Sequence, residues 1–166
     1  NPGSNLRLGN GAPPIAALME AGIGFALGTD NCALDDNEDY LSELRLGRLL
    51  GRSAAAAPAE QLRTFLATAT ERGADAAFLD GTGRIGAGLK ADLVAIDLAE
   101  SEGAYLDPDG QVLEAMLARA TGRDVVMTMV EGKILCRNGR AAGTDAGSLR
   151  AKASQTARET RLDPET

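Results

Sequence analysis

The sequence of 166 residues contains no histidine and no tryptophan, and only 3% of its residues are aromatic. Without histidine the chain has no imidazole to offer a metal ion, and its core must rely on Leu, Ala, Val and Ile. The formal net charge is -7 and no basic block stands out. Nucleic acid is therefore not expected as a partner, because phosphate binding needs a positive patch. No apolar run approaches about 18 residues, and no visible signal peptide is present, so neither a membrane span nor secretion is predicted.

Cysteine is also scarce. Cys32 and Cys136 lie far apart and form no C-x-x-C pattern, which favours a reducing compartment over a disulfide. We therefore expect a cytoplasmic protein. The chain does have 44% hydrophobic residues, which over this length is enough for a sizeable core.

Residues 22–39 read GIGFALGTDNCALDDNED, a short apolar run that ends on an aspartate before a loop crowded with carboxylates. The apolar residues from Ile23 to Leu27 are bounded by glycines and are too few for an ordinary helix, so they predict a buried strand. Such a strand would place Asp30 at its carboxyl end, where ligands meet side chains in α/β sheets and barrels. Asp30 could equally cap the following turn, and the spacing alone leaves both interpretations open.

A loop, a helix and the Asp30 strand follow one another at the start of the chain, which is the repeating order of a parallel α/β fold. The loop is expected at 1–11, and helical spacing of apolar residues predicts helices at 13–21, from an N-cap at Asp36 to about residue 52, at 62–73 and at 74–79. The acidic residues of the Asp30 loop are interpreted as capping and solvation of the second helix: Asp35, Asp36, Glu38 and Asp39.

Residues 81–141 change to a pattern that is typical of strands. Strands are predicted at 93–96, 125–130 and 133–137, and a tight hairpin at Glu131-Gly132 joins the last two. A turn at 107–110 leads into a helix through 112–117. Residues 148–162 have a thin apolar stripe, which predicts a surface helix or a frayed tail.

Three matches along the chain, the first of which combines two segments, resemble the amidohydrolase superfamily in its branch of nucleobase and nucleoside deaminases and triazine hydrolases. NPGSN at 1–5 and GIGFALGTDN at 22–31 are similar to the family's P-x-S-N and G-T-D segments, which follow its seventh barrel strand and end its eighth. GRIGAGLKADLVAID at 83–97 is similar to G-x-I-x-x-G-x-x-A-D-L-V-x-x-D, and VEGK at 130–133 to the V-x-G-K/R hairpin. Together they span residues 1 to about 141.

The resemblance implies an α/β fold, namely the C-terminal portion of a (β/α)8 metal-dependent hydrolase barrel plus the C-terminal strands of its flanking β-sandwich. Residues 1–80 would form the last βα units with a helical extension, 81–141 part of the composite sandwich with one barrel-packing helix, and 142–166 a C-terminal helix or tail. A complete barrel needs about 250 residues. We therefore expect two partners, a missing N-terminal part of the enzyme and a homo-oligomer that covers exposed edges.

The same resemblance assigns Asp30 two roles, metal ligand and proton shuttle, in removing an amine or a similar group from an aza-aromatic ring (a nucleobase, pterin or triazine). The expected metal is zinc, with iron as the alternative, and the family's histidine ligands are absent from this chain. Ser4 and Asn5 match the family's S-N pair that lines the substrate site. Both could equally form a polar turn bonded to its own backbone. Cys32 could line the pocket, but burial as a small hydrophobe is the default.

A second class of function stays open, a non-catalytic module whose acidic loop binds Ca²⁺ or a protein partner. Residues 30–39 do not follow the EF-hand loop, which needs acids at alternate positions, a central glycine and a distal glutamate. This interpretation also leaves the three matches to the family without explanation. We therefore expect an enzyme that acts on a small-molecule substrate when complete, with this chain inactive alone.

Overall fold

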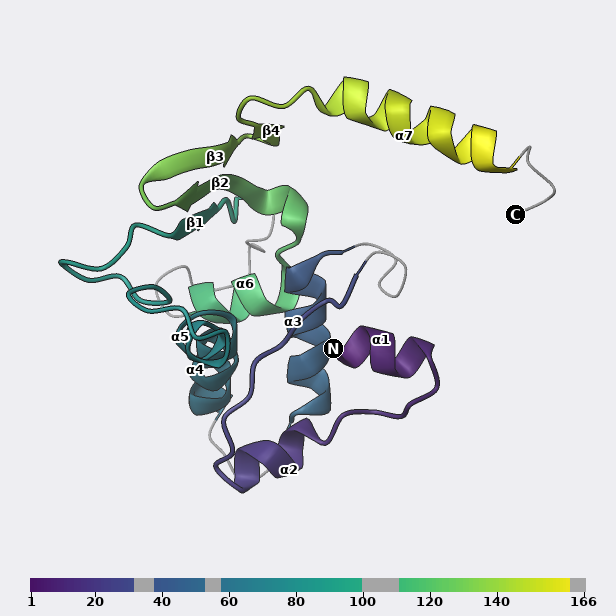
Figure 1. Ribbon diagram of the computed structural model, residues 1–166. Helices are drawn as coiled ribbons and strands as arrows, with labels where there is room; N and C mark the ends of the chain where they lie inside the picture. The colour runs from purple at the N-terminus through teal and green to yellow at the C-terminus, as the bar shows by residue number, and fades with distance from the viewer. Residues whose placement is uncertain (32–37, 53–57, 100–110, 162–166) are drawn as a thin grey trace.

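The computed structural model consists of a body of short helices, a small sheet beside it and a long helix that extends away from both (Figure 1). It describes residues 1–31, 38–52, 58–99 and 111–161. The helices are α1 (Pro2–Arg7), α2 (Ile15–Glu20), α3 (Tyr40–Leu50), α4 (Pro58–Ala69), α5 (Glu71–Ala76), α6 (Val112–Arg119) and α7 (Ala146–Arg161). The strands are β1 (Leu93–Ile96), β2 (Val125–Val130), β3 (Lys133–Arg137) and β4 (Arg140–Ala141), with a 3-10 helix η1 (Gly122–Asp124) before β2.

The helical body packs around a small apolar core. Ile15 of α2, Leu44 of α3, Phe65 of α4 and Leu117 of α6 are buried in one cluster. Burying a side chain as large as Phe65 stabilises the fold by about 1.5–3 kcal/mol. Gly51, just after α3, allows a close approach, because a Cβ there would lie 2.6 Å from the Phe65 ring and 2.7 Å from Ile15. These contacts fix α3 at the centre of the body.

The four strands form an antiparallel sheet in the order β1-β2-β3-β4. β1 pairs with β2, with Leu93 opposite Met129, and β2 pairs with β3. Glu131 and Gly132 connect β2 to β3 with φ angles of 47° and 78°. Positive φ at both positions suits a two-residue turn that matches the twist of the strands. The predicted hairpin and the three predicted strands are confirmed, whereas β4 was not predicted.

Asp92 fastens this hairpin to the segment before β1. Its carboxylate accepts a hydrogen bond of 2.7 Å from the Glu131 N–H, and the Gly132 N–H bonds to the Ala91 carbonyl at 3.1 Å. The bond from Glu131, followed by one from the Thr82 side chain, lowers the pKa of Asp92. Because the folded pKa is depressed, ionised Asp92 stabilises the fold above the ordinary aspartate pKa of about 3.9. That contribution is lost as the pH falls through the folded value.

Replacing Asp92 by asparagine should therefore make the stability of the hairpin less dependent on pH in the acidic range. Asparagine cannot ionise, so no charge remains to be lost below about pH 4. Amide hydrogen exchange at Glu131, normalised to an unstructured peptide, is the measurement. In the parent protein its protection should fall several-fold as the pH drops from about 6 to about 3, and in Asp92→Asn it should stay level. A parent profile that is flat over this range would contradict the prediction.

The buried strand predicted before Asp30 is wrong for the described residues. Residues 23–30 are assigned to no strand, and the Ile23 side chain is 53% exposed. Phe25 and Leu27 are partly buried and pack on the helical core, and Phe25 meets Phe65 edge to face with ring centroids 6.4 Å apart. A strand needs a hydrogen-bonded neighbour. None of the described segments provides one here, so the stretch runs as an irregular link from α2 to α3.

Several predicted boundaries also shift. The loop expected at 1–11 contains α1, because Pro2 opens a helix where its missing N–H is tolerated. The helix predicted from Asp36 to about residue 52 is α3, and Asp39 is its N-cap and not part of its first turn. The predicted cap, Asp36, and the predicted turn at 107–110 lie outside the described residues. Gly73 does not end a helix but lies within α5.

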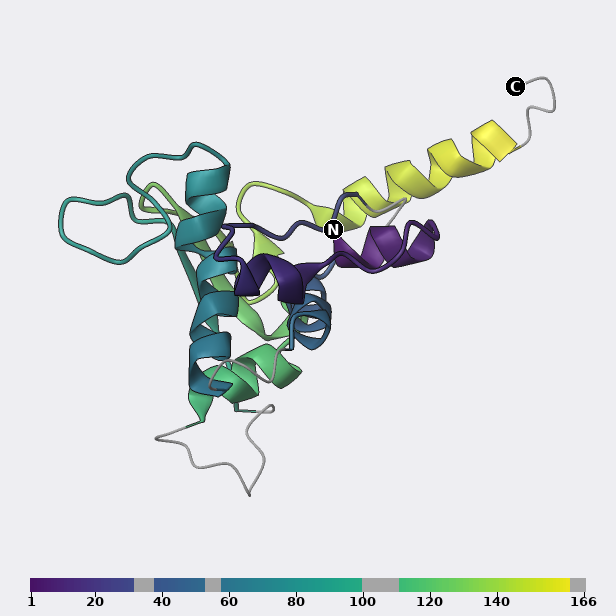
Figure 2. The same cartoon turned by 90° about the horizontal axis from the view of Figure 1, so that it is seen from below.

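The helix α7 confirms the predicted surface helix. Its side chains over residues 146–160 are exposed, and it leaves the body in both ribbon views (Figures 1 and 2). The structure thus confirms a mixture of helices and sheet. The barrel, the sandwich and the division at residues 80 and 141 remain predictions.

Candidate functional site

Asp30 is the last residue of the irregular stretch 23–30, which we call the Asp30 segment, and it is exposed to solvent. Its backbone has φ 78°, in the left-handed region that side chains other than glycine rarely adopt. Aspartate tolerates this conformation better than most residues, yet the conformation still costs free energy. Four other described residues besides glycine also have a positive φ, among them Phe78 and Glu131, so this conformation is compatible with a functional Asp30 and is not specific to it.

Ser4 and Asn5 lie on α1. Ser4 is buried, and its Oγ donates a hydrogen bond of 3.1 Å to the Asn1 carbonyl in the turn before. In the described part of the chain the Ser4 hydroxyl thus bonds to the backbone of its own turn, as in the polar-turn alternative of the sequence analysis. Asn5 is half-buried, and its backbone closes both ends of the short helix by bonding to Asn1 and Asn10.

The N-terminal end of α1 reaches the segment that carries Asp30. Asn1 Oδ1 lies 2.8 Å from the position that a Cβ would take on Gly28, two residues before Asp30. Only glycine permits this approach without displacing Asn1. The structure therefore brings the predicted substrate-lining helix against the chain that delivers the predicted catalytic carboxylate.

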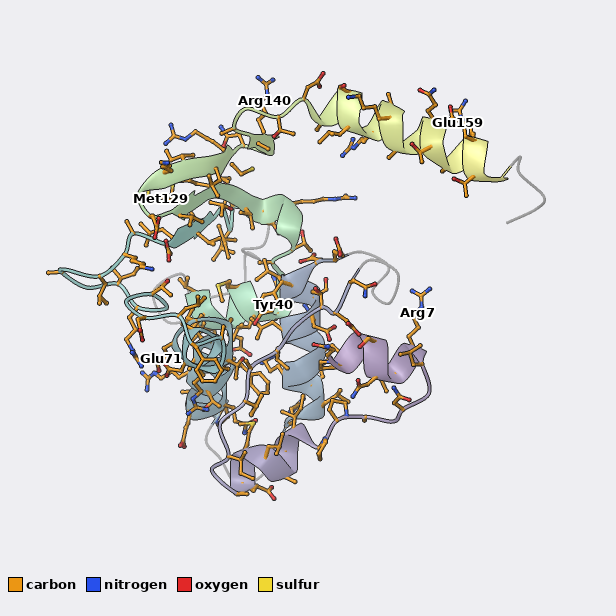
Figure 3. All side chains as sticks on the ribbon, viewed as in Figure 1. Arg7, Tyr40, Glu71, Met129, Arg140 and Glu159 are labelled. Carbon is orange, nitrogen blue, oxygen red and sulfur yellow. The ribbon has the colours of Figure 1, made fainter. Side chains whose placement is uncertain are left out.

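Glu43 of α3 is a residue that the sequence analysis missed. Its side chain is only 5% exposed, and Oε1 accepts a hydrogen bond of 2.8 Å from the Gly3 N–H of α1. Burial raises the pKa of the nearby Tyr40 hydroxyl, and the negative charge of Glu43 raises it further. Tyr40 itself lies in the helical body at the start of α3 (Figure 3). The sequence offered one indication of its burial, namely that Glu43 lies on the same face of α3 as Tyr40 and Gly47.

Asp39 acts as a cap and a tie between elements. Its carboxylate accepts hydrogen bonds from the Leu41 N–H at 3.0 Å and the Ser42 Oγ at 3.2 Å, which caps α3. It also accepts one from the Gly122 N–H of η1 at 3.0 Å. The capping interpretation of the acidic loop is confirmed for Asp39 and is not tested for Asp35 and Asp36, which lie outside the described residues. A carboxylate engaged in this way is poorly placed for a Ca²⁺ site.

The part of the chain that the structure describes holds no group of three His, Cys, Asp or Glu residues that could bind a metal ion. Asp30 alone offers one or two oxygen ligands, and a structural zinc site needs about four. The described residues by themselves therefore do not fit a complete metal centre. Cys136 is a free, half-buried thiol, and Cys32 lies outside the described residues.

A hollow of the described surface lies away from Asp30, beside the residues that directly follow α2. It has a volume of about 710 Å³ and is lined by α2, α4, α5 and the link between α2 and α3, including Ile23 and Phe25. Its walls include carboxylates as well as apolar groups, such as Glu60 and Asp75. We assign no catalytic role to it. None of the helices in the described ranges is long and apolar enough to cross a membrane.

Comparison with known proteins agrees with the resemblance seen in the motifs. The amidohydrolase family profile matches residues 1–135. A 5-methylthioadenosine/S-adenosylhomocysteine deaminase of Halobacterium salinarum is 36% identical over 159 residues, which cover 95% of this chain and 36% of that protein. A 5'-deoxyadenosine deaminase of Methanosarcina mazei is 34% identical over 160 residues, covering 96% and 36%. The chain thus spans about a third of the length of these relatives.

Solved structures give the same picture. A zinc-bound adenosine deaminase from Xanthomonas campestris superposes with a TM-score of 0.85 at 33% identity, over 98% of this chain and 37% of that one. A zinc complex of an atrazine chlorohydrolase from Arthrobacter aurescens gives a TM-score of 0.73 at 26% identity, over 92% and 34%. With a family match over most of its length and relatives of the same kind in sequence and structure, this chain belongs to the amidohydrolase family.

Proposed function

We propose that the chain is the C-terminal part of a metal-dependent aminohydrolase that cleaves a C–N bond on an aza-aromatic ring. The observation that carries this proposal is the GTD motif that ends on Asp30, within a chain that matches the amidohydrolase family over residues 1–135. The relatives named above are deaminases of adenosine-like compounds and a triazine chlorohydrolase. From these relatives we infer that the substrate contains an electron-poor ring on which a hydroxyl group replaces a substituent.

In this proposal Asp30 moves a proton. Its carboxylate accepts one from the attacking water while the oxygen bonds to the ring carbon, and then gives it to the amine as the C–N bond breaks and ammonia leaves. A divalent metal, zinc as in the neighbouring structures, would lower the pKa of that water when bound. Ser4 and Asn5, on the helix that contacts the Asp30 segment, would help to form the wall of the substrate site.

A substrate panel on the full-length protein that contains this chain tests the proposal. We expect ammonia release and the loss of the 6-aminopurine absorbance with 5-methylthioadenosine, S-adenosylhomocysteine or adenosine, because the two adenosine-type deaminases named above are 36% and 34% identical to this chain. A triazine serves as the comparison substrate. Release of no amine from any of these compounds at saturating zinc would contradict the aminohydrolase assignment.

The proposal also includes a partner surface. Phe78 and Ile85, in the link between α5 and β1, are each 91% exposed, and Val94 of the neighbouring β1 is exposed as well. Large apolar side chains held in water mark interaction sites. Each such side chain loses about 1.5–3 kcal/mol of stabilisation when it is left unburied. A few of them together are comparable with the free energy of unfolding of a typical domain, about 5–15 kcal/mol. We infer that the remaining part of the enzyme, or a second copy of this chain, covers them.

Sedimentation equilibrium of the isolated chain at low micromolar concentration checks this inference. We expect species heavier than the 17.1 kDa monomer, and we expect Phe78→Asp together with Ile85→Asp to lower the average mass. Leu149→Asp on the exposed helix α7 is the control and should leave the mass unchanged. A monodisperse monomer that melts cooperatively would show that the chain closes a fold of its own.

A further inference from the structure

We propose that Glu43 is a positioning residue, which sets the Ser4–Asn5 helix at a fixed distance from the Asp30 segment. Its carboxylate is nearly inaccessible, at 5% exposed, and it accepts the Gly3 N–H of α1 at 2.8 Å. A buried carboxylate costs free energy unless it is hydrogen-bonded. The Gly3 N–H is one of the first amides of α1, which have no partner within the helix. The bond therefore satisfies both groups and anchors the start of α1 to α3.

The Glu43 carboxylate lies directly against the Gly3 backbone. A Cβ on Gly3 would lie 2.7 Å from Glu43 Oε2 and 3.6 Å from Oε1, so both oxygens face the Gly3 backbone. A side chain at position 3 would therefore force the Glu43 carboxylate to move or α1 to shift away from α3. A charge-assisted hydrogen bond at this distance is also stronger than one between neutral groups. Glu43 thus fixes the position of α1, whereas an apolar contact would let it slide.

The same helix α3 also holds the Asp30 segment, one turn further on. Gly47 follows Glu43 by four residues and lies on the same face, and a Cβ there would be 2.8 Å from a Leu27 methyl group. Leu27 precedes Asp30 by three residues. α3 therefore contacts α1 through Glu43 and the Asp30 segment through Gly47. Loss of the Glu43 contact should release α1 and leave Asp30 in place.

This inference rests on the proposed function, because it matters only if Ser4 and Asn5 meet a substrate on which Asp30 acts. Releasing α1 should weaken substrate binding more than chemistry. In the full-length protein, Glu43→Ala should raise KM about tenfold to a hundredfold, the factor that corresponds to a hydrogen bond to a charged group. Its kcat should stay within about threefold of the parent, since Asp30 is held through Gly47.

Two variants separate positioning from charge. Glu43→Gln keeps the size of the side chain and an oxygen that can accept the Gly3 N–H, so its KM should return to within a few-fold of the parent value. Glu114→Ala removes an exposed carboxylate on α6 and serves as the matched control, with no expected change in KM. Hydrogen exchange over residues 1–8 adds a readout that is independent of activity. It should accelerate in Glu43→Ala and not in Glu114→Ala.

If Glu43→Ala fails to fold, Gly3→Ala supplies the same test from the other side of the contact. Its added methyl group would meet Glu43 Oε2, so it should disturb the Gly3–Glu43 hydrogen bond, raise KM and accelerate exchange over residues 1–8. Gly147→Ala on α7 should change neither KM nor this exchange. Unchanged exchange, or a fall in kcat with KM unchanged, would overturn the positioning role and leave the aminohydrolase proposal standing. An inactive parent protein would overturn the proposed function, and this inference with it.

Discussion

Replacing Asp30 by asparagine in the full-length protein should lower kcat by about a hundredfold to ten-thousandfold, the usual contribution of a positioned proton-transfer group. The amide keeps the size of the side chain and cannot accept the proton from water at neutral pH. Asparagine also tolerates a positive φ, so the backbone at φ 78° should survive the change. The loss should therefore report on chemistry, with little effect of misfolding.

A matched aspartate controls for the removal of one negative charge. Asp145 accepts the Gly147 N–H at 3.0 Å at the start of α7, remote from the site. Asp145→Asn should keep kcat within about twofold of the parent. If Asp30→Asn retained activity within about tenfold of the parent, Asp30 would have no place in the mechanism, whatever its backbone conformation.

The isolated chain should neither turn over substrate nor bind zinc tightly. It contains no histidine, and its described residues offer no group of three metal ligands. A single carboxylate leaves most of the zinc coordination shell to water, so binding should be weaker than about micromolar. Competition with a zinc-binding dye measures the affinity directly. Micromolar or tighter binding that Asp30→Asn abolishes would show that the chain builds a metal site of its own.

Local patterns in the sequence predicted the elements that depend on near neighbours. Glu131-Gly132 between two β-rich runs is sufficient for a hairpin, because the turn geometry fixes the pairing next to it, with Val130 opposite Lys133. The register shift between Thr128 and Met129 could not be predicted from the turn. The apolar spacing from Tyr40 to Leu50 is sufficient for α3. The end of a helix is harder to predict, since the residue that caps α3 is Asp39, although Asp36 offers the same carboxylate three residues earlier.

The parts that failed depend on distant contacts. The apolar residues around Phe25 have the composition of a strand, yet strand formation requires a partner that the described residues do not supply. Glu43 was missed for the same reason. Nothing near it in the sequence shows that Gly3, 40 residues away, delivers the N–H that makes its burial tolerable. The motif around Asp30 was visible from sequence, but its link to α1 through Asn1 and Gly28 was not.

The most direct test of the central claim is zinc-dependent ammonia release after recombining this chain with the remaining part of the proposed enzyme. The two parts are expressed together and assayed with 5-methylthioadenosine, with each part alone and a chelated sample as controls. We predict activity only in the recombined, zinc-loaded sample, and its loss when the chain carries Asp30→Asn. Equal activity of the other part without this chain, or none after a stable complex has formed, would contradict the claim that this chain completes an aminohydrolase.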